Sequence, residues 1–384
     1  MLQHEMKQFK KLISESKSVL ILLAQNPKGD YFCSALALAY LCEAKNIKST
    51  IAFHDPYKQI SLFEFLPKPE NVEFTQSIAG SRDLILTFNT KYNKILDIKT
   101  EQTDDEFKIY ITPEKGMIDS RDFSFVPGKF PYDVIVTVGA TNKEAMGKLY
   151  EEIPDIFFEL PIINIDNKTD NEQFGQINIV NPVTSSVSEL VGNLLEYLYG
   201  GFISKECAEC VLAGIIDETR SFQNNKTTPN AMTLASKLIE YGADQQMIVQ
   251  NLYRNLPFSL LQLWGRVLKN FQTSKRNKKV IISSLSHKDI IETNAKEHHI
   301  YGILSKMKES YPTGKIFILL YEYKQNQVIA LIDTQYANLD IRDFIDEKFI
   351  VLPNEVYKIT LNSQTIDGAR EKVCDMIAPY LKYL

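Results

Sequence analysis

Acidic and lysine side chains recur at the ends of predicted strands. The apolar run 19-VLILLA-24 leads into the polar turn 25-QNPKGD-30, and the run 161-PIINID-166 ends in an acid. The carboxyl ends of parallel strands share one edge of a sheet, so side chains at these ends are expected to meet in one cleft. The polar turn 217–224 is expected to flank that cleft. The charged residues concerned are Lys28, Asp30, Asp166, Lys168, Asp217 and Glu218.

Acids and histidines converging at this edge would indicate a metal site. The five histidines of the chain all lie elsewhere, at His4, His54, His287, His298 and His299. The cleft instead combines carboxylates with two ammonium groups. Lysines in such a place can form ion pairs with the acids, or can act as point charges for a phosphate.

Apolar runs alternate with helical patterns along the first 245 residues. Strands are predicted at 19–24, which reads as buried, and at 49–55, 83–89, 133–140 and 161–166. Helices are predicted at 34–46, 185–199, 204–216 and 230–244, and the segment 142–158 is predicted to start as a helix. This alternation is typical of parallel βαβ units. The segment between the third and fourth strands contains 107-FKIYIT-112, which predicts a small hairpin on the sheet. We therefore expect an α/β fold whose first domain has a parallel sheet flanked by helices.

A second, smaller α/β domain is predicted after the cationic stretch 271-FQTSKRNKK-279. Its elements are a strand at 280–285, a helix at 290–310, strands at 315–323 and 327–333, and a terminal helix at 365–382. The expected domains are 1–245, a helical linker over 246–279, and 280–384. We expect a cleft between the two domains.

The composition excludes several classes of protein. The net charge of −5 gives no global basic surface for nucleic acid, which leaves only a local basic cleft. Five scattered cysteines argue against a disulfide framework and for a cytoplasmic location, and Cys207 and Cys210 are predicted inside a helix. No apolar run reaches the length of a membrane span, and no membrane partner is expected.

Four ordered blocks over residues 15–245 resemble the DHH phosphoesterase family. They are N-P-x-G-D with S-A-L-A-L, I-N-I-D with N-E-Q-F-G-Q-I-N, S-S-x-S-E-L, and G-I-I-x-x-T-x-S-F with N-x-T-T-P. An ordered set of blocks is more specific than any single motif. The family includes oligoribonucleases that degrade very short RNA, cyclic-dinucleotide phosphodiesterases and single-strand exonucleases. The resemblance implies two Mn²⁺ ions, held by Asp and His, that activate water and stabilise the leaving oxygen.

The metal-binding positions that the resemblance implies are largely replaced. The first block has Ala24 for histidine and Lys28 for aspartate but keeps Asp30, and Gly139 stands where the family places an aspartate. The eponymous D-H-H reads Asp166, Asn167 and Lys168, and Glu218 takes the last aspartate position. The glycine-rich G-G-G-H segment that the family uses to hold phosphate is absent from the C-terminal part.

These replacements change the electrostatics of the predicted site. An ammonium has no lone pair for a metal, and at about 4 Å it would repel a divalent ion by several kcal/mol even at an effective dielectric near 20. Three residual candidate ligands remain: Asp30, Asp166 and Glu218. We therefore expect the family's Mn²⁺ to be lost and no other cofactor to replace it. The two lysines are expected to pair with the surviving acids or, alternatively, to hold a phosphate.

The function predicted from these residues is that of a catalytically degenerate DHH-like protein. It would bind a nucleotide or short single-stranded nucleic acid through Asn26, Lys28, Lys168 and Arg220. One alternative is an active phosphodiesterase with a reduced metal site, acting on short oligonucleotides or cyclic dinucleotides. Another is a protein-interaction scaffold, and a homodimer is among the expected assemblies. Tyr31 and Phe32 are expected to fill core volume rather than to stack on a base.

Overall fold

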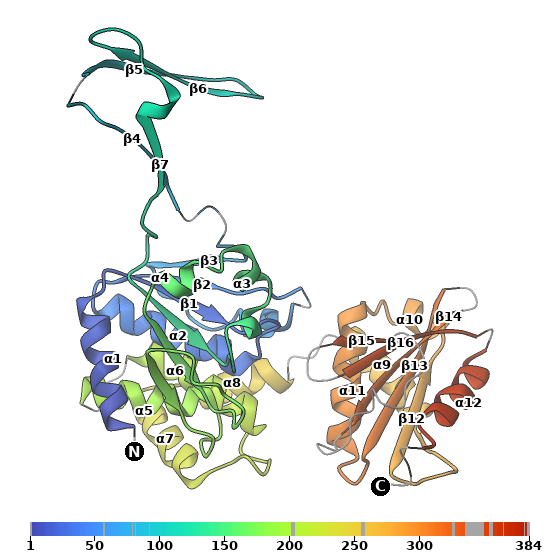
Figure 1. Cartoon of the computed structure of the whole chain (residues 1–384). Helices are drawn as coiled ribbons and strands as arrows, with labels where there is room; N and C mark the ends of the chain where they lie inside the picture. The colour runs from blue at the N-terminus through green and yellow to red at the C-terminus, as the bar shows by residue number, and fades with distance from the viewer. Residues whose placement is uncertain are drawn as a thin grey trace. The chain divides into compact units, whose positions relative to one another are not determined.

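The chain divides into two compact units, Met1–Val249 and Gln250–Leu384. Figure 1 shows the chain in a computed structural model. The structure describes residues 2–381 except 57, 79, 81, 92, 201–203, 255–257, 325–326, 335–348, 353–355, 364 and 380. Within these ranges, no helix is long and apolar enough to cross a membrane.

The first unit is built on a six-stranded sheet in which every pairing is parallel. The strand order is β10 (Ile177–Val180), β9 (Ile162–Asp166), β8 (Val134–Val138), β1 (Ser18–Leu23), β2 (Lys48–Ala52) and β3 (Val72–Thr75). The chain runs outward from β1 to β3 and later outward from β8 to β10. The order therefore reverses between β1 and β8, which is where parallel sheets bind ligands.

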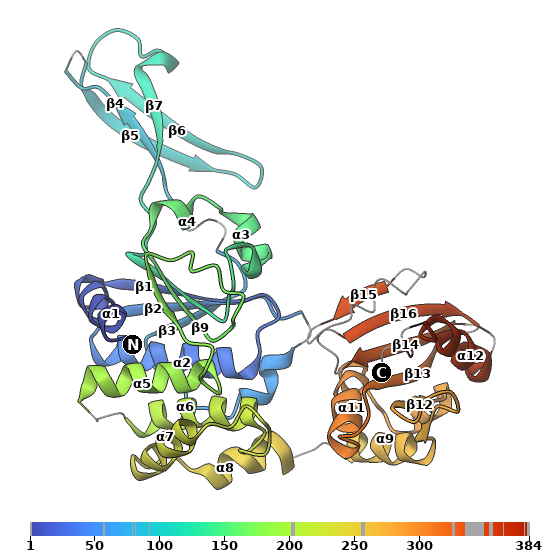
Figure 2. The ribbon, with the colours of Figure 1, turned by 60° about the horizontal axis from the view of Figure 1, so that its bottom comes forward.

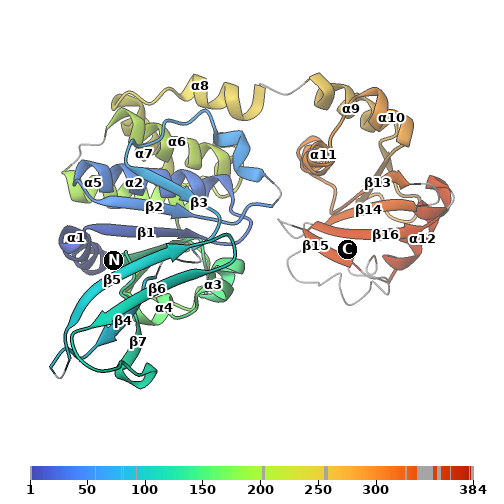
Figure 3. The ribbon, with the colours of Figure 1, turned by 90° about the horizontal axis from the view of Figure 1, so that it is seen from above.

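Helices cover both faces of this sheet. Helices α2, α5, α6 and α7 lie on one face, and the short helices α3 and α4 lie on the other (Figure 3). Helix α6 packs on α2 and α5, so it forms an outer layer over them. The helices are α1 (Gln3–Glu15), α2 (Gly29–Ala44), α3 (Lys148–Glu152), α4 (Ile156–Glu159), α5 (Val187–Tyr199), α6 (Lys205–Thr219), α7 (Pro229–Glu240) and α8 (Gln245–Val249). The α/β class and the parallel sheet expected from the sequence are confirmed.

Helix α2 shows why the sequence folds in layers. Its residues are apolar on nearly every side, and burial extends from Gly29 through Cys42 with one break. Such a helix must be covered on two faces, and the sheet and α6 cover it. Tyr31 and Phe32 are both buried, which confirms the expected filling of the core. Cys207 and Cys210 are buried free thiols in α6, as predicted.

Two parts of the first unit differ from the sequence prediction. The apolar segment 83–89 does form a strand, β4 (Leu84–Phe88), but it pairs with β7 (Phe123–Pro127) outside the main sheet. The segment 142–158, predicted to start as a helix, forms a 3-10 turn followed by the short helices α3 and α4. Gly147 with φ 55° and Pro154 account for the breaks between them, because proline has no backbone N–H and glycine favours left-handed turns.

The second unit has a six-stranded mixed sheet in the order β11 (Gln272–Thr273), β12 (Val280–Leu285), β13 (Ile316–Lys324), β14 (Gln327–Thr334), β16 (Val356–Asn362) and β15 (Phe349–Leu352). Only β12 and β13 pair in parallel. Its helices are α9 (Phe258–Lys269), α10 (His287–Glu292), α11 (Glu297–Ser310) and α12 (Ile366–Met376). The helix predicted at 290–310 is thus two helices, and the terminal helix stops at Met376. Residue 382, the predicted end of that helix, lies outside the described residues.

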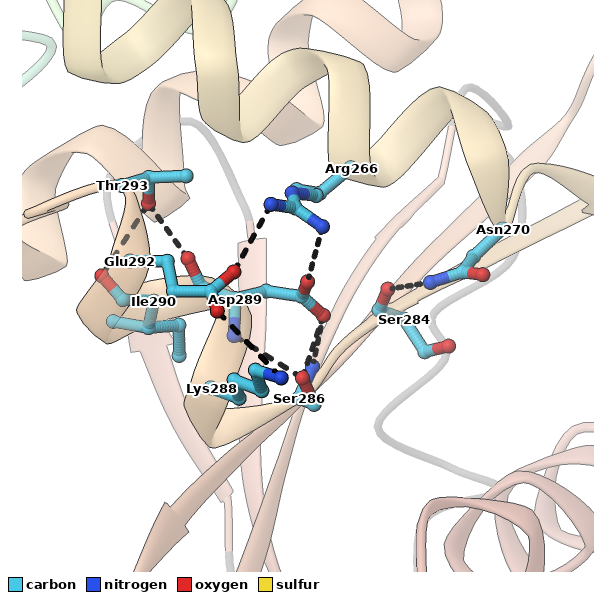
Figure 4. Close-up of polar contacts among 9 residues, drawn as sticks. All are labelled: Arg266, Asn270, Ser284, Ser286, Lys288, Asp289, Ile290, Glu292 and Thr293. Carbon is cyan, nitrogen blue, oxygen red and sulfur yellow. Dashed lines mark hydrogen bonds and ion pairs between the residues drawn. The ribbon is translucent and has the colours of Figure 1, made fainter.

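Polar contacts fix α9 and α10 to the start of this sheet (Figure 4). Arg266 pairs with Asp289 at 3.7 Å and with Glu292 at 3.0 Å. Ser286 caps α10 in a reciprocal capping box with Asp289, and Asn270 donates to the Ser284 carbonyl at 2.8 Å. Part of the segment expected to be a linker, 258–269, therefore packs as a helix of the second unit.

Candidate functional site

The turn after β1 brings Lys28 and Asp30 to the edge of the sheet. Asn26 takes a left-handed conformation with φ 52°, and its N–H donates to the His54 carbonyl at 3.2 Å. Lys28 is the N-cap of α2, and Gly29 follows it. A Cβ on Gly29 would lie 1.9 Å from the Phe63 ring. Only glycine therefore fits at this position. Asp30 then enters the helix fully buried.

The carboxylate of Asp30 caps another helix. Its two oxygens accept the backbone N–H groups of Val187 and Ser188, each at 2.8 Å, at the start of α5. These donors and the helix dipole stabilise the anion. Burial nevertheless outweighs them, and the charge of Glu218 adds to it, so that the pKa of Asp30 is raised to about 7. Asp30 is thus a structural link between α2 and α5.

Asp217 is the second carboxyl group with a raised pKa. Burial, followed by the charges of Glu218 and Asp30, raises the pKa of Asp217 to about 7. The positive charge of Lys28 and the backbone N–H of Asp30 act in the opposite direction. The carboxyl groups of Asp30, Asp217 and Glu218 therefore lie close enough together that ionising all three at once costs free energy.

Asp166 lies at the end of β9 and is held by amides. Its oxygens accept the N–H of Asn167 and the side-chain amide of Asn171, both at 2.8 Å. Asn171 also donates to the Ala140 carbonyl at 2.9 Å, which ties the loops after β8 and β9 together. Asn178 bridges both backbone groups of Gly175. Asn171 and Asn178 thus stabilise the loop between β9 and β10 through side-chain hydrogen bonds.

Tyr31 contacts Gly139 and lies close to both lysines of the candidate site. Gly139 follows β8 with φ 72°, and a Cβ there would lie 2.6 Å from the Tyr31 ring. The ring therefore fills the space in front of the position where the resemblance implies an aspartate. The ammonium groups of Lys28 and Lys168 lie 5.9 and 5.8 Å from the ring centroid, at cation–π distance. Lys168 also donates to the Gly139 carbonyl at 3.3 Å.

The expected ion pairs between these lysines and the surviving acids are absent within the described ranges, so that expectation was wrong. Glu218 forms its ion pair with Lys226 instead, a residue that the sequence analysis missed. Lys226 directly precedes the T-T-P of the fourth block, and its place in a loop that flanks the cleft was the available signal. The two lysines instead lie over the Tyr31 ring, and Lys168 donates to a carbonyl, although the charge of Lys28 still acts on Asp217.

A cavity of about 340 Å³ opens at this edge of the first unit. Three lysines line it, together with short polar side chains that can donate or accept hydrogen bonds. Its residues are Lys28, Asp30, Tyr31, Asn167, Lys168, Pro182, Val183, Thr184, Ser185, Glu218, Asn225, Lys226 and Thr228. The structure thus brings together five predicted site residues: Lys28, Asp30, Asn167, Lys168 and Glu218. Ala24, Asn26, Gly139, Asp166 and Arg220 are not among the lining residues.

The donors at this edge do not fit two divalent cations. Both oxygens of Asp30 and both of Asp166 already accept hydrogen bonds, and the Glu218 carboxylate pairs with Lys226. In the part of the chain that the structure describes, no group of three or more His, Cys, Asp or Glu side chains is arranged to hold a metal. A two-ion site needs about six or more such ligands with open positions for substrate.

Replacing Gly139 by alanine is expected to lower the free energy of unfolding by about 2 kcal/mol or more, from left-handed strain and from crowding against Tyr31. Urea unfolding measures this change. Gly116→Ala is the matched control, because Gly116 also has a positive φ of 65° but no atom within 4 Å of an added Cβ. Equal losses in the two variants would contradict a close fit of the ring against Gly139.

Residues 18–215, just over half of the chain, match the family described as "DHH family, N-terminal domain". A bifunctional oligoribonuclease and PAP phosphatase of Thermus thermophilus is 33% identical over 107 residues, which are 28% of this chain and 32% of that protein. A probable bifunctional oligoribonuclease and PAP phosphatase of Streptococcus mutans is 27% identical over 146 residues, 38% of this chain and 45% of that protein. The matches thus span less than half of the length of either relative.

Among solved structures, an exopolyphosphatase-related protein of Bacteroides fragilis has the same fold. It superposes with a TM-score of 0.69 at 17% identity, and the match covers 99% of this chain and 98% of that one.

Proposed function

Because the chain belongs to the DHH family, we propose that its cavity binds the phosphate of a nucleotide or of short single-stranded nucleic acid without hydrolysing it. The observation that carries this proposal is that Lys28 and Lys168 line the cavity and lie over the Tyr31 ring, which packs against Gly139, whereas Lys226 is paired with Glu218. Lysine is an ordinary point charge for phosphate. Manganese has no place in the proposal, because two carboxylates that would bind it are held by backbone and amide donors.

The names of the relatives support this choice of ligand. Two of them are called oligoribonuclease and PAP phosphatase, which are activities toward short nucleic acid and a nucleotide phosphate. In this chain the same edge of the sheet keeps polar groups that suit a phosphate and a sugar, namely Asn167, Thr184 and Asn225. The Tyr31 ring makes cation–π contacts with the ammonium groups of Lys28 and Lys168, which helps to hold these groups in position. We therefore expect recognition to persist where hydrolysis is lost.

The experiment that tests this proposal measures binding and turnover on the same preparation. Nucleoside mono- and diphosphates and di- to pentaribonucleotides are expected to raise the melting temperature in the presence of EDTA, because a ligand that binds only the folded state stabilises it. With Mn²⁺ added, we expect no release of product from these substrates or from cyclic dinucleotides. Turnover that Asp30→Ala and Asp166→Ala both abolish would instead establish the reduced-metal phosphodiesterase. The absence of any shift with all ligands would favour the interaction scaffold.

A further inference from the structure

The insertion between β3 and β8 forms two separate ribbons outside the main sheet (Figure 2). Strand β4 pairs with β7, and β5 (Ile95–Gln102) pairs with β6 (Phe107–Pro113). We call residues 84–127 the arm. None of its residues lines the cavity of the candidate site.

The β5–β6 ribbon has one apolar face and one charged face. Opposite residues of an antiparallel pair share a face, and faces alternate along each strand. The register places Ile98, Phe107, Ile109 and Ile111 on one face, together with Thr100 and Gln102. It places Asp97, Lys99, Glu101, Lys108 and Tyr110 on the other face. Ile98 is 58% exposed and Phe107 is 60% exposed. An isolated two-stranded ribbon with an uncovered apolar face is only marginally stable in water.

The outer edge of β5 is also open, since β5 pairs only with β6 within the described ranges. We propose that this edge pairs, antiparallel and about a two-fold axis at Ile98, with β5 of a second copy of the chain. Ile98 then faces the partner subunit's Ile98. Asp97 faces the partner subunit's Lys99, and Lys99 faces the partner subunit's Asp97. The result is a four-stranded sheet, a size at which sheets with an apolar face become stable.

Charge selects this register among the symmetric ones. An axis at Asp97 or at Lys99 would place like charges directly opposite each other, which destabilises a strand pair. An axis at Thr100 would set Lys99 against Glu101, but the Glu101 carboxylate already accepts the Tyr110 hydroxyl at 2.8 Å. That axis would also set Ile98 against Gln102. Within one chain, Asp97 and Lys99 lie 3.6 Å apart and are largely exposed, so little is lost when each changes partner.

Charge reversal tests the register in the full-length protein. The wild type is expected to be a dimer by light scattering coupled to size-exclusion chromatography. Asp97→Lys and Lys99→Asp should each weaken the dimer by at least about tenfold, and the double variant should restore it, because both opposite pairs are recreated. Lys115→Asp, an exposed charge change after β6, is the matched control and should leave the dimer intact. A monomeric wild type, or a double variant that stays dissociated, overturns the proposal.

Cross-linking gives a second, independent readout. Opposite residues in antiparallel strands have Cα atoms about 4.5–5.5 Å apart, within the range that a disulfide spans. Ile98→Cys should therefore form covalent dimers on mild oxidation, beyond the background of the native cysteines. Thr100→Cys should not, since Thr100 would face the partner subunit's Leu96. Cross-linking of Thr100→Cys in preference to Ile98→Cys would place the axis at Thr100 and refute the register.

Discussion

Replacing Lys28 and Lys168 together with glutamine is expected to weaken nucleotide binding by about 100-fold or more. Each ammonium that bonds a phosphate contributes about 1.5–3 kcal/mol, and a factor of ten corresponds to about 1.4 kcal/mol. Glutamine keeps similar length and polarity but removes the charge. The fold should survive, because the Lys28 and Lys168 side chains contact mainly the Tyr31 ring and a carbonyl. Isothermal titration calorimetry in the presence of EDTA measures the change.

The control for this variant is Lys237→Gln, which removes a lysine that pairs with Glu196 outside the cavity. It should bind as the wild type does. Binding that also weakens as salt rises would indicate that charge carries the interaction. If the double variant binds nucleotide as tightly as the wild type, the cavity is not the phosphate site, whatever the enzymatic assays give.

Stability is expected to fall as pH rises from about 4 to about 7. The pKa values of Asp30 and Asp217 are raised in the folded protein from 3.8 to about 7. Between these values the folded protein holds protons that the unfolded chain has released, so the free energy of unfolding decreases with pH. One pKa unit corresponds to about 1.36 kcal/mol. We expect a total loss of about 4 kcal/mol, less than two fully buried groups would give, because Asp217 is partly exposed.

Urea unfolding at pH 5 and at pH 8 measures the larger part of this loss, and Asp217→Asn should reduce it by about half. Asp217 is the better position to change, because Asp30→Asn would also remove an acceptor from the start of α5. The exposed Asp155→Asn is the control and should keep the wild-type slope. A free energy of unfolding that rises between pH 5 and pH 8 would show that these two carboxyl groups are ionised at little cost in the folded state.

The residues near the candidate site could be identified from the sequence because they follow strands. The apolar run before Asn26 and the run that ends at Asp166 are local signals of buried parallel strands. Parallel pairing then places their carboxyl ends at one edge, and the structure confirms this with β1, β8 and β9 side by side. The replacement of acids and histidines by Lys28, Asn167 and Lys168 could also be recognised without a structure.

The partners of these residues could not be predicted, because they depend on contacts between distant segments. Sequence spacing does not show that Asp30 caps α5, 157 positions away. Nor does it show that Glu218 pairs with Lys226 rather than with Lys28 or Lys168. The composition of the segment 83–89 is that of a core strand, which predicts a place in the main sheet. The strand instead pairs with β7, which begins at Phe123. A pairing with such a distant segment cannot be inferred from the local residue pattern.

The sequence by itself determined the α/β class, the sheet edge at which the polar residues gather and the loss of the family's histidines. Those features follow from local periodicity and residue type. Only the tertiary structure decided that both lysines lie over the Tyr31 ring and that this ring packs against Gly139. That arrangement depends on packing volume and on the left-handed backbone at Gly139, both of which arise from the whole fold.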